Sequence, residues 1–526
     1  MFKEIELKLA PEKAFDKLFI DDLVLKIEKL HLTYVEKIEI VKRSIDARKQ
    51  PIIYLLKIRI FLKTNLENNN LLETVEPNLN FELSKNPNSV NTKKIAIIGF
   101  GPAGIFAAFQ LLEMGFKPIV IERGKKIKER RRDLAELNKK IIVNNESNYC
   151  FGEGGAGTYS DGKLYTRSKK RGNVEKVLQT FVKYGADTDI LVNTHPHIGT
   201  NKLPAIIENM RESILAHGGE IFFESKLTNF KINNNIISEI EINGNNLMAV
   251  DEIILATGHS ARDIFELLHS KQIKIEPKSF ALGVRIEHPQ MLIDKIQYKR
   301  ELRGDYLPPA AYSLVTQASG CGVFSFCMCP GGIIAPASTN QNETVVNGWS
   351  PSKRNGEFAN SGMVVTVEEK HWQPLFGQGN LAALEFQKMI EKKAFDTSNS
   401  IIAPAQRVED FIQKKISKNL PKCSYLPGIQ SHDLDSILPP FISKSLKEGL
   451  IQFGKQLYGY RTNEAILVGV ESRTSSPVRI PRNKETMRHV QIKNLIPCGE
   501  GAGYAGGIVS AAIDGILCAL ACEYNN

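Results

Sequence analysis

One stretch near residue 100 constrains the fold of this chain more than any other. A short apolar run is followed by glycines in a G-x-G-x-x-G spacing, a helix-like apolar segment, a second apolar run and an acidic residue. Short apolar runs are typical of buried parallel strands, and this order is that of a βαβ unit. The sequence therefore predicts an α/β fold built on a parallel sheet. The apolar runs are Ile95–Ile98 and Pro118–Ile121, the glycines are Gly99, Gly101 and Gly104, and the acidic residue is Glu122.

Each residue of this motif has a physical role. Gly99 permits a tight turn, Gly101 lets a pyrophosphate approach the backbone, and Gly104 lets the helix pack on the strand. The N-terminus of the helix offers free N–H groups to the phosphates. Glu122, about 20 residues further on, is placed to accept a hydrogen bond from a ribose 2′-hydroxyl, and its charge disfavours a 2′-phosphate. We therefore predict a dinucleotide site, with a glycine-rich turn in an unrelated α/β fold as the alternative.

The same glycine spacing recurs twice without the rest of the motif. The copy at Gly152, Gly154 and Gly157 follows no strand-like run, and the copy at Gly501, Gly503 and Gly506 has too little chain after it for a βαβ unit. Only the copy at Gly99 has the complete context.

Composition places the chain among soluble proteins of the cytoplasm. With 526 residues it should hold two or three domains, and a net charge of +10 allows anionic partners without requiring them. No apolar stretch reaches the roughly 18–20 residues that span a membrane, and the N-terminus has no secretory apolar region. The eight cysteines form no C-x-x-C pair, which fits a reducing compartment, and no Cys/His cluster has a metal spacing.

Changes in pattern divide the chain into five segments. We expect a small N-terminal α+β domain of ferredoxin-like type, then a polar linker, then a nucleotide-binding domain with a β-meander, interrupted by an α+β substrate domain. The boundaries are 1–63 for the N-terminal domain, 64–92 for the linker, 93–279 and 466–526 for the two parts of the nucleotide-binding domain, and 280–465 for the substrate domain.

The N-terminal domain contains a basic segment, VKRSIDARKQ, between two strand-like runs. A solvated edge strand is the preferred interpretation, because lysines at a sheet edge prevent sheets from pairing. The alternative is a surface for RNA or an acidic partner, formed by Lys42, Arg43, Arg48 and Lys49.

A glycine-rich segment, NYCFGEGGAGTYSDGK, follows the first motif and suits a backbone that lies against a flat ligand. Gly154, Gly155 and Gly157 would allow close approach, while Ser160, Asp161 and Lys163 would contact the ligand or a substrate. Two later segments also point to a ligand. An apolar strand ends in Ala256-Thr257-Gly258, and NLIPCGEGAGYAGG precedes an apolar helix whose N-terminus could face an electron-rich group.

Three of these segments, GFGPAG with ERG, the ATG strand end and CGEGAG, resemble the FAD-binding superfamily related to glutathione reductase. Within it, the chain is similar over nearly its whole length to the bacterial FAD-dependent (NAD/FAD-utilising) dehydrogenases that carry a small N-terminal domain. This resemblance implies a Rossmann-like FAD domain, with Glu500 at a position that is more often Asp. The cofactor-binding residues expected from the motifs and the resemblance are Gly99, Gly101, Pro102, Ala103, Gly104, Glu122, Arg123, Gly154, Gly155, Gly157, Ser160, Asp161, Lys163, Ala256, Thr257, Gly258, Gly499, Glu500, Gly501, Gly506, Gly507 and Ile508.

The chain departs from the disulfide reductases of that superfamily. Cys150 has no second cysteine within its motif, and no second βαβ nucleotide domain is evident. We therefore expect an oxidoreductase, such as a dehydrogenase, that passes a hydride between flavin N5 and a small organic molecule, with NAD(P)H as a transient donor left open. A flavoprotein that binds or modifies RNA, and a flavin-bound module without turnover, are the alternatives.

The candidate catalytic residues are Arg285, His288, Cys329 and Arg473. A structural ion pair is the preferred interpretation of each arginine, and bidentate binding of a substrate carboxylate is the alternative. Cys329 lies in the segment Cys327-Met328-Cys329 and could face the substrate as a thiol. Burial in the core is the preferred interpretation of this cysteine, contact with the substrate is the alternative, and a strained bridge to Cys327 is the minority outcome.

Overall fold

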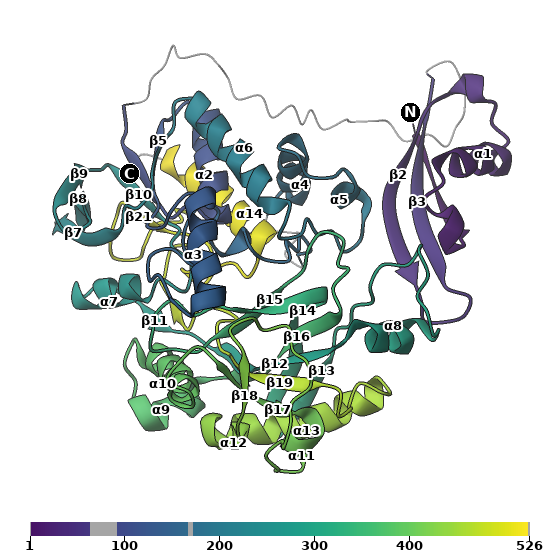
Figure 1. The fold of residues 1–526 in the computed structure, drawn as a ribbon. Helices are drawn as coiled ribbons and strands as arrows, with labels where there is room; N and C mark the ends of the chain where they lie inside the picture. Colours follow the sequence, from purple (N-terminus) through teal and green to yellow (C-terminus); the bar gives the residue numbers. More distant parts are fainter. Residues whose placement is uncertain (1, 64–91, 167–171, 524–526) are drawn as a thin grey trace.

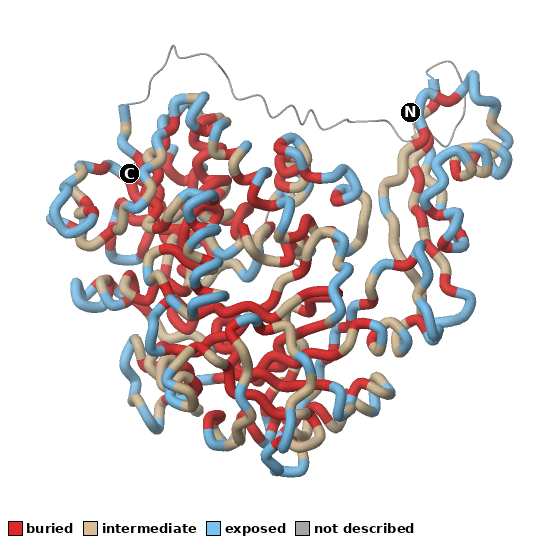
Figure 2. The backbone as a smooth tube through the Cα atoms, in the orientation of Figure 1, coloured by how far each residue is buried: buried red, intermediate tan, exposed pale blue. Residues whose placement is uncertain are grey.

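The computed structural model describes residues 2–63, 92–166 and 172–523. Three parts are visible in Figure 1: a small N-terminal unit at one side, a parallel sheet with its helices, and a large, mostly antiparallel sheet beneath it. The strands of both large parts are mostly buried, as Figure 2 shows. Within the described ranges, no helix has the length and apolarity needed to cross a membrane.

The N-terminal unit is a three-stranded antiparallel sheet with the order β1-β3-β2. Its elements are β1 (Phe2–Leu9), α1 (Lys17–Glu28), β2 (Val35–Asp46) and β3 (Ile53–Leu62). Strand β3 alternates strictly between buried and half-buried residues, as expected of a strand with one face on a core. Residues 2–63 therefore form a β-α-β-β unit, and the expectation of a ferredoxin-like domain is wrong because its second helix and fourth strand do not follow in this range.

The basic segment of this unit lies on an edge strand, β2, as the preferred interpretation of the sequence requires. Two of its four basic residues are engaged. Arg43 contacts Asp189 at 3.3 Å and its carbonyl accepts the Thr194 N–H, whereas Arg48 pairs with Asp46 at 2.7 Å. The unit also contacts the large-sheet part, because the Gln50 amide donates to the Tyr298 carbonyl at 2.8 Å.

The parallel sheet has the strand order β21-β10-β4-β5-β6 and confirms an α/β domain around the first motif. Its strands are β4 (Ile95–Ile98), β5 (Pro118–Ile121), β6 (Glu220–Phe222), β10 (Glu252–Leu255) and β21 (Leu495–Pro497). Alternate residues of β4 face opposite sides. Ile95 and Ile97 pack on helices, whereas Ala96 and Ile98 pack on the meander and α7 (Arg262–Ser270).

The helices on the first face are α2 (Pro102–Glu113), α4 (Val174–Lys183), α6 (Leu203–Ala216) and α14 (Ile508–Leu520). The predicted meander is present as β7 (Leu227–Asn233), β8 (Ile236–Ile242) and β9 (Asn246–Ala249). Helix α3 (Ile127–Lys140) presents most of its basic residues to solvent. Segments far apart in the sequence thus meet on this face, because α2 and α14 pack side by side.

The large sheet has the order β13-β14-β16-β12-β19-β17-β18, with β15 paired to β14. Its strands are β12 (Phe280–Pro289), β13 (Val315–Ala318), β14 (Cys321–Pro336), β15 (Val346–Trp349), β16 (Phe358–Val367), β17 (Ala403–Arg407), β18 (Ile429–Ser431) and β19 (Ile466–Glu471). The boundary expected at residue 465 is therefore misplaced, because β19 pairs with β12 and belongs to this sheet.

The remaining elements connect or cover these sheets. The helices are α5 (Asp189–Val192), α8 (Gln290–Tyr298), α9 (Glu369–Phe376), α10 (Ala382–Asp396), α11 (Val408–Ile412), α12 (Leu434–Ile437) and α13 (Pro440–Gln456), and a short ribbon joins β11 (Glu276–Pro277) to β20 (Val478–Arg479). Most of the linker expected over 64–92 lies outside the described residues.

Candidate cofactor and active site

A cavity of about 430 Å³ lies where the carboxyl ends of the parallel strands face the large sheet. Ligands of open α/β sheets bind at this edge. Its wall combines the first motif, the glycine-rich segment, the ATG strand end and the C-terminal motif, which are far apart in the sequence. The expected residues on the wall are Gly99, Gly101, Pro102, Ala103, Glu122, Arg123, Gly155, Gly157, Ser160, Asp161, Lys163, Ala256, Thr257, Gly258, Glu500, Gly506, Gly507 and Ile508, together with Arg473.

The three glycines of the first motif are needed for different reasons. A Cβ at Gly99 would lie 2.5 Å from the Ala256 carbonyl oxygen, and one at Gly104 would lie 2.0 Å from the Gly99 oxygen. At Gly101, by contrast, a Cβ would make only an ordinary 3.8 Å contact with Gly155. Packing within the protein does not require glycine at position 101, which caps α2 on the cavity wall. A ligand that places a phosphate or its own chain close to this residue would require glycine here.

Glu122 is held by three backbone N–H groups. One carboxylate oxygen accepts from Phe100 at 2.8 Å, and the other accepts from Gly124 at 2.8 Å and Gly152 at 2.9 Å. A carboxylate has about four acceptor positions, so one remains for a ligand hydroxyl. The residue thus orders the turns around it and still fits an adenosine ribose.

The glycine-rich segment is fixed by Arg130, which is fully buried on α3. Its guanidinium donates to four backbone carbonyls at 2.8–3.0 Å, those of Asn148, Tyr149, Glu153 and Gly155. Because a buried guanidinium needs partners for its donors, these bonds hold the loop in one shape. Gly155 then lies against Gly101, where a Cβ would be only 3.0 Å from the Gly101 Cα.

Four expected cofactor-binding residues do not reach the wall. Gly104 packs on Gly99, and Gly154 faces Thr158 and Ile207. Gly499 lies against Ala103, and Gly501 lies against Gly258. They shape the backbone behind the cavity, where glycine is required by close approach.

The C-terminal motif leaves space at the N-terminus of α14. A Cβ at Gly506 or Gly507 would meet no atom within 4 Å, so both residues are open to the cavity. Burial raises the pKa of Glu500, on the same wall, to about 7. His259 lies 3.8 Å from Glu500, and burial together with Arg473 and Arg262 lowers the pKa of this histidine to about 3. Its buried Nδ1 has no partner in the described structure, which makes it available to a ligand.

Arg473 is the one catalytic candidate on the wall, and it is held by carboxylates. Its guanidinium contacts Glu343 at 2.5 Å and Glu391 at 3.2 Å, and Glu391 also accepts from Arg262 at 2.7 Å. Its charge is thus neutralised within the protein, in keeping with the structural alternative.

The other three catalytic candidates lie behind the wall. Arg285 is fully buried against Glu471 at 2.9 Å, and His288 is bound to the Tyr460 carbonyl at 2.8 Å. Cys329 is also fully buried, whereas Cys327 reaches the cavity. The hypothesis that Cys329 faces a ligand is therefore wrong. Of the two neighbouring cysteines on β14, Cys327 lines the cavity, and Cys150 lines it as well.

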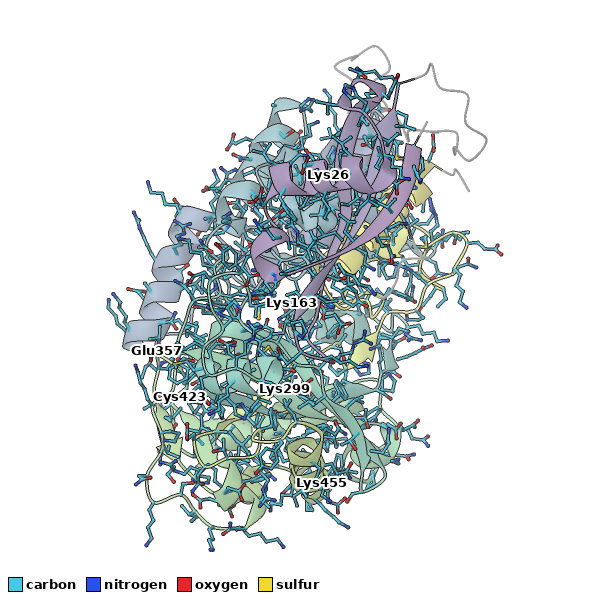
Figure 3. All side chains as sticks on the ribbon, turned by 90° about the vertical axis from the view of Figure 1, so that its right-hand side faces the viewer. Lys26, Lys163, Lys299, Glu357, Cys423 and Lys455 are labelled. Atoms are coloured by element: carbon cyan, nitrogen blue, oxygen red, sulfur yellow. The ribbon has the colours of Figure 1, made fainter. Side chains whose placement is uncertain are left out.

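The cavity wall also includes one residue, His259, and one contact, that of Lys163, which sequence reasoning missed. His259 directly follows the ATG strand end, so its position next to that motif was the available signal. Lys163 of the glycine-rich segment meets β14 across the cavity and contacts both Cys327 and Cys329. Figure 3 labels Lys163 near the centre of the molecule. No pattern in the sequence links residue 163 to residues more than 160 positions away.

One group of possible metal ligands lies in the described residues, formed by Cys498, Asp514 and Cys518. Arg482 donates to Asp514 at 2.9 Å and to the Cys518 sulfur at 3.3 Å. Because a cationic side chain already fills this group, it gives no argument for a metal ion.

Comparison with protein families agrees with the motifs. Residues 279–474 match the family described as "FAD-dependent protein, C-terminal domain-like", and residues 1–61 match a domain of unknown function (DUF8436). The first match covers the large sheet and includes β19. The family match, the fold and the cavity together support FAD as the cofactor of this chain.

A protein of Clostridium beijerinckii described as uncharacterized is 40% identical over 494 residues, which is 92% of this chain and 91% of the relative. The chain belongs to the same family as this protein. Among solved structures, FqzB has a TM-score of 0.35 at 12% identity over 83% of this chain and 76% of that chain. Glycine oxidase from Bacillus cereus has a TM-score of 0.30 at 12% identity over 82% of this chain and 96% of that chain.

Proposed function

We propose that this protein is an FAD-dependent oxidoreductase that exchanges a hydride between flavin N5 and a small organic substrate. The observation that carries the proposal is the continuity of one cavity, from the dinucleotide motif at Gly101 to Cys327 of the large sheet. In such an arrangement one part of the cavity holds the cofactor and the other presents a substrate to it.

The residues of the first half fit a dinucleotide. The N-terminus of α2 offers N–H groups to a pyrophosphate at Gly101, where the protein leaves room for it, and Glu122 retains one acceptor position for a ribose hydroxyl. Bound FAD would supply two-electron chemistry. The N-terminus of α14, opened by Gly506 and Gly507, would stabilise negative charge on the flavin ring.

The second half is a wall made by the large sheet. Phe326 and Cys327 of β14 and Asn347 of β15 line it, with Lys163 opposite. The rigid sheet would position the substrate, and Lys163 would favour a substrate with an electron-rich or anionic group. Arg473 would shape the cavity wall rather than attract the substrate by its charge, because two carboxylates already neutralise that charge.

Two observations concern the cellular compartment of the protein and the RNA-binding alternative. All eight cysteines are free thiols, which supports a reducing compartment such as the cytoplasm. The RNA-binding alternative is less well supported, because Arg43 and Arg48 of its proposed surface are already paired with carboxylates. NAD(P)H remains a proposed electron donor.

The cofactor assignment is tested with Gly101→Val. The full chain should purify yellow and release FAD rather than FMN on denaturation, and the variant should fold but lose the cofactor. Gly379→Val is the matched control, because a Cβ there meets no atom within 4 Å and the residue lies away from the cavity. A Gly101→Val protein with full FAD content would refute the assignment.

The reaction class is tested by anaerobic reduction of the bound flavin. NADH, NADPH and fractions of small metabolites are added in turn, and bleaching of the flavin absorbance is followed. At least one small donor should reduce the flavin at a rate that saturates with its concentration. If the flavin is reduced only by dithionite, the oxidoreductase proposal is wrong.

A further inference from the structure

Strand β14 loses its register at its two closely spaced cysteines. Phe326 is opposite Gly362 of β16, whereas Cys329 is opposite Asn360, so β14 carries one extra residue between these pairs. Cys327 has a φ of 47°, in the left-handed region that non-glycine residues rarely adopt. The irregularity is thus a β-bulge, and bulges re-aim side chains beside functional sites.

The bulge brings both sulfur atoms to one ammonium group. In a regular strand, side chains two residues apart are separated by roughly 7 Å. Here Lys163 Nζ lies 3.6 Å from the Cys327 sulfur and 3.5 Å from the Cys329 sulfur, and the Cys329 thiol donates to the Cys327 carbonyl at 3.2 Å. The sequence makes a bridge between these two cysteines the minority outcome, because a regular strand would hold their side chains too far apart. The bulge removes this obstacle.

The surroundings favour one thiolate in this pair. Arg285 donates to the Cys329 sulfur at 3.5 Å and to the Cys327 carbonyl at 2.7 Å. The neighbouring Cys329 thiol, followed by the charges of Lys163 and Arg285, lowers the pKa of Cys327 well below its ordinary value. Burial, together with the neighbouring Cys327, raises the pKa of Cys329. The pair therefore favours one proton and one negative charge, and the cations Lys163 and Arg285 beside the sulfurs stabilise that charge.

The two cysteines also differ in how far they are accessible from the cavity. Cys327 is half-buried and lines the cavity, whereas Cys329 is fully buried behind it. Asp161 lies 3.4 Å from Lys163, and Arg354 pairs with Asp161 at 2.7 Å, so the ammonium is held in place from the opposite side. A reactive cysteine on the cavity wall beside a fully buried one is the arrangement of an attacking and a resolving cysteine.

We propose that Cys327 and Cys329 form a redox-active thiol pair that reduces a small-molecule disulfide entering the cavity. The Cys327 thiolate attacks one sulfur of the disulfide, forms a mixed disulfide and releases the first thiolate. Cys329 then gives up its proton and attacks the Cys327 sulfur, which releases the second thiol. The pair is oxidised to an intramolecular disulfide, and the substrate takes up two electrons and two protons.

Reopening the pair requires two electrons and two protons from a donor. Reduced FAD in the same cavity is a donor of this class, and only this return step depends on the proposed function. A bridge between residues two apart departs from the geometry that disulfides prefer, which makes it easily reduced.

The pair is tested on the full chain with dithiobis(nitrobenzoic acid) as the probe, after reduction and removal of reductant. The wild type should release two equivalents of the coloured thiol in a fast phase and retain no adduct. Cys329→Ser should release one equivalent and keep a mixed disulfide on Cys327, located by mass spectrometry. Cys327→Ser should lose the fast phase. Cys423→Ser is the control, because this half-buried thiol has a raised pKa and should leave the fast phase unchanged.

The pH dependence gives a second, independent measurement. An ordinary thiol with a pKa of about 8.5 reacts nearly 100-fold more slowly at pH 6 than at pH 8, because so little of it is ionised. The Cys327 rate should change by less than about threefold over this range. In Lys163→Met the rate at pH 6 should fall at least tenfold. A fast phase that survives Cys327→Ser, or a Cys329→Ser protein without a mixed disulfide, would overturn the proposal, whether or not FAD is bound.

Discussion

Glu391 of α10 connects three segments around the cavity, and its replacement by glutamine has a calculable effect. The fully buried carboxylate accepts from Arg262 at 2.7 Å, from Ser472 at 2.5 Å and from Arg473 at 3.2 Å. Burial alone would raise its pKa, but the two arginines hold the pKa at about 2 instead of the ordinary 4.5. At about 1.4 kcal/mol for each pH unit, this difference corresponds to about 3 kcal/mol of stability at neutral pH.

The sign of the pH dependence follows from the lowered pKa. The folded state holds its proton less tightly than the unfolded state, so the stabilisation is complete above about pH 4.5 and is lost as the pH falls towards 2. Glu391→Gln should therefore lower the free energy of unfolding by about 3 kcal/mol at pH 7, and the gap to wild type should close in acid.

Urea unfolding followed by tryptophan fluorescence measures this effect directly. The two tryptophans, Trp349 on β15 and Trp372 on α9, both belong to the large-sheet part that Glu391 supports. Glu369→Gln, at an exposed position of α9, is the control and should match wild type. Equal stability of Glu391→Gln and wild type at pH 7, or a gap that stays constant down to pH 2.5, would refute the reasoning.

Two other perturbations test how the cavity is supported. Arg130→Met should lower the free energy of unfolding by about 3–5 kcal/mol and empty the cofactor site, because four carbonyls of the glycine-rich segment lose their donor. The melting temperature and the FAD content measure this effect, and Arg132→Met, at an exposed position, is the control. A chain that begins at residue 92 should melt at a lower temperature but keep FAD, because the cavity is lined by residues from Ile98 onward. Loss of FAD from that chain, or unchanged FAD in Arg130→Met, would contradict these expectations.

The sequence by itself determined the parallel sheet and the place of the cofactor motif. Gly99 and Gly104 are required by contacts within a few residues or with the neighbouring strand, so their spacing carries the information locally. The same holds for Glu122 at the end of β5 and for the apolar strands on either side. Burial on both faces makes such strands recognisable without knowledge of the rest of the chain.

Tertiary structure alone decided which chemical groups reach the cavity. Arg285, His288 and Cys329 are reactive residue types in the expected domain, but strand pairing buries them behind the wall. A single extra residue in β14 turns Cys327 to the cavity, and Lys163 meets it from another domain. The position of a bulge, and the partner of a buried charge, depend on contacts between segments far apart in sequence, and local patterns do not encode those contacts.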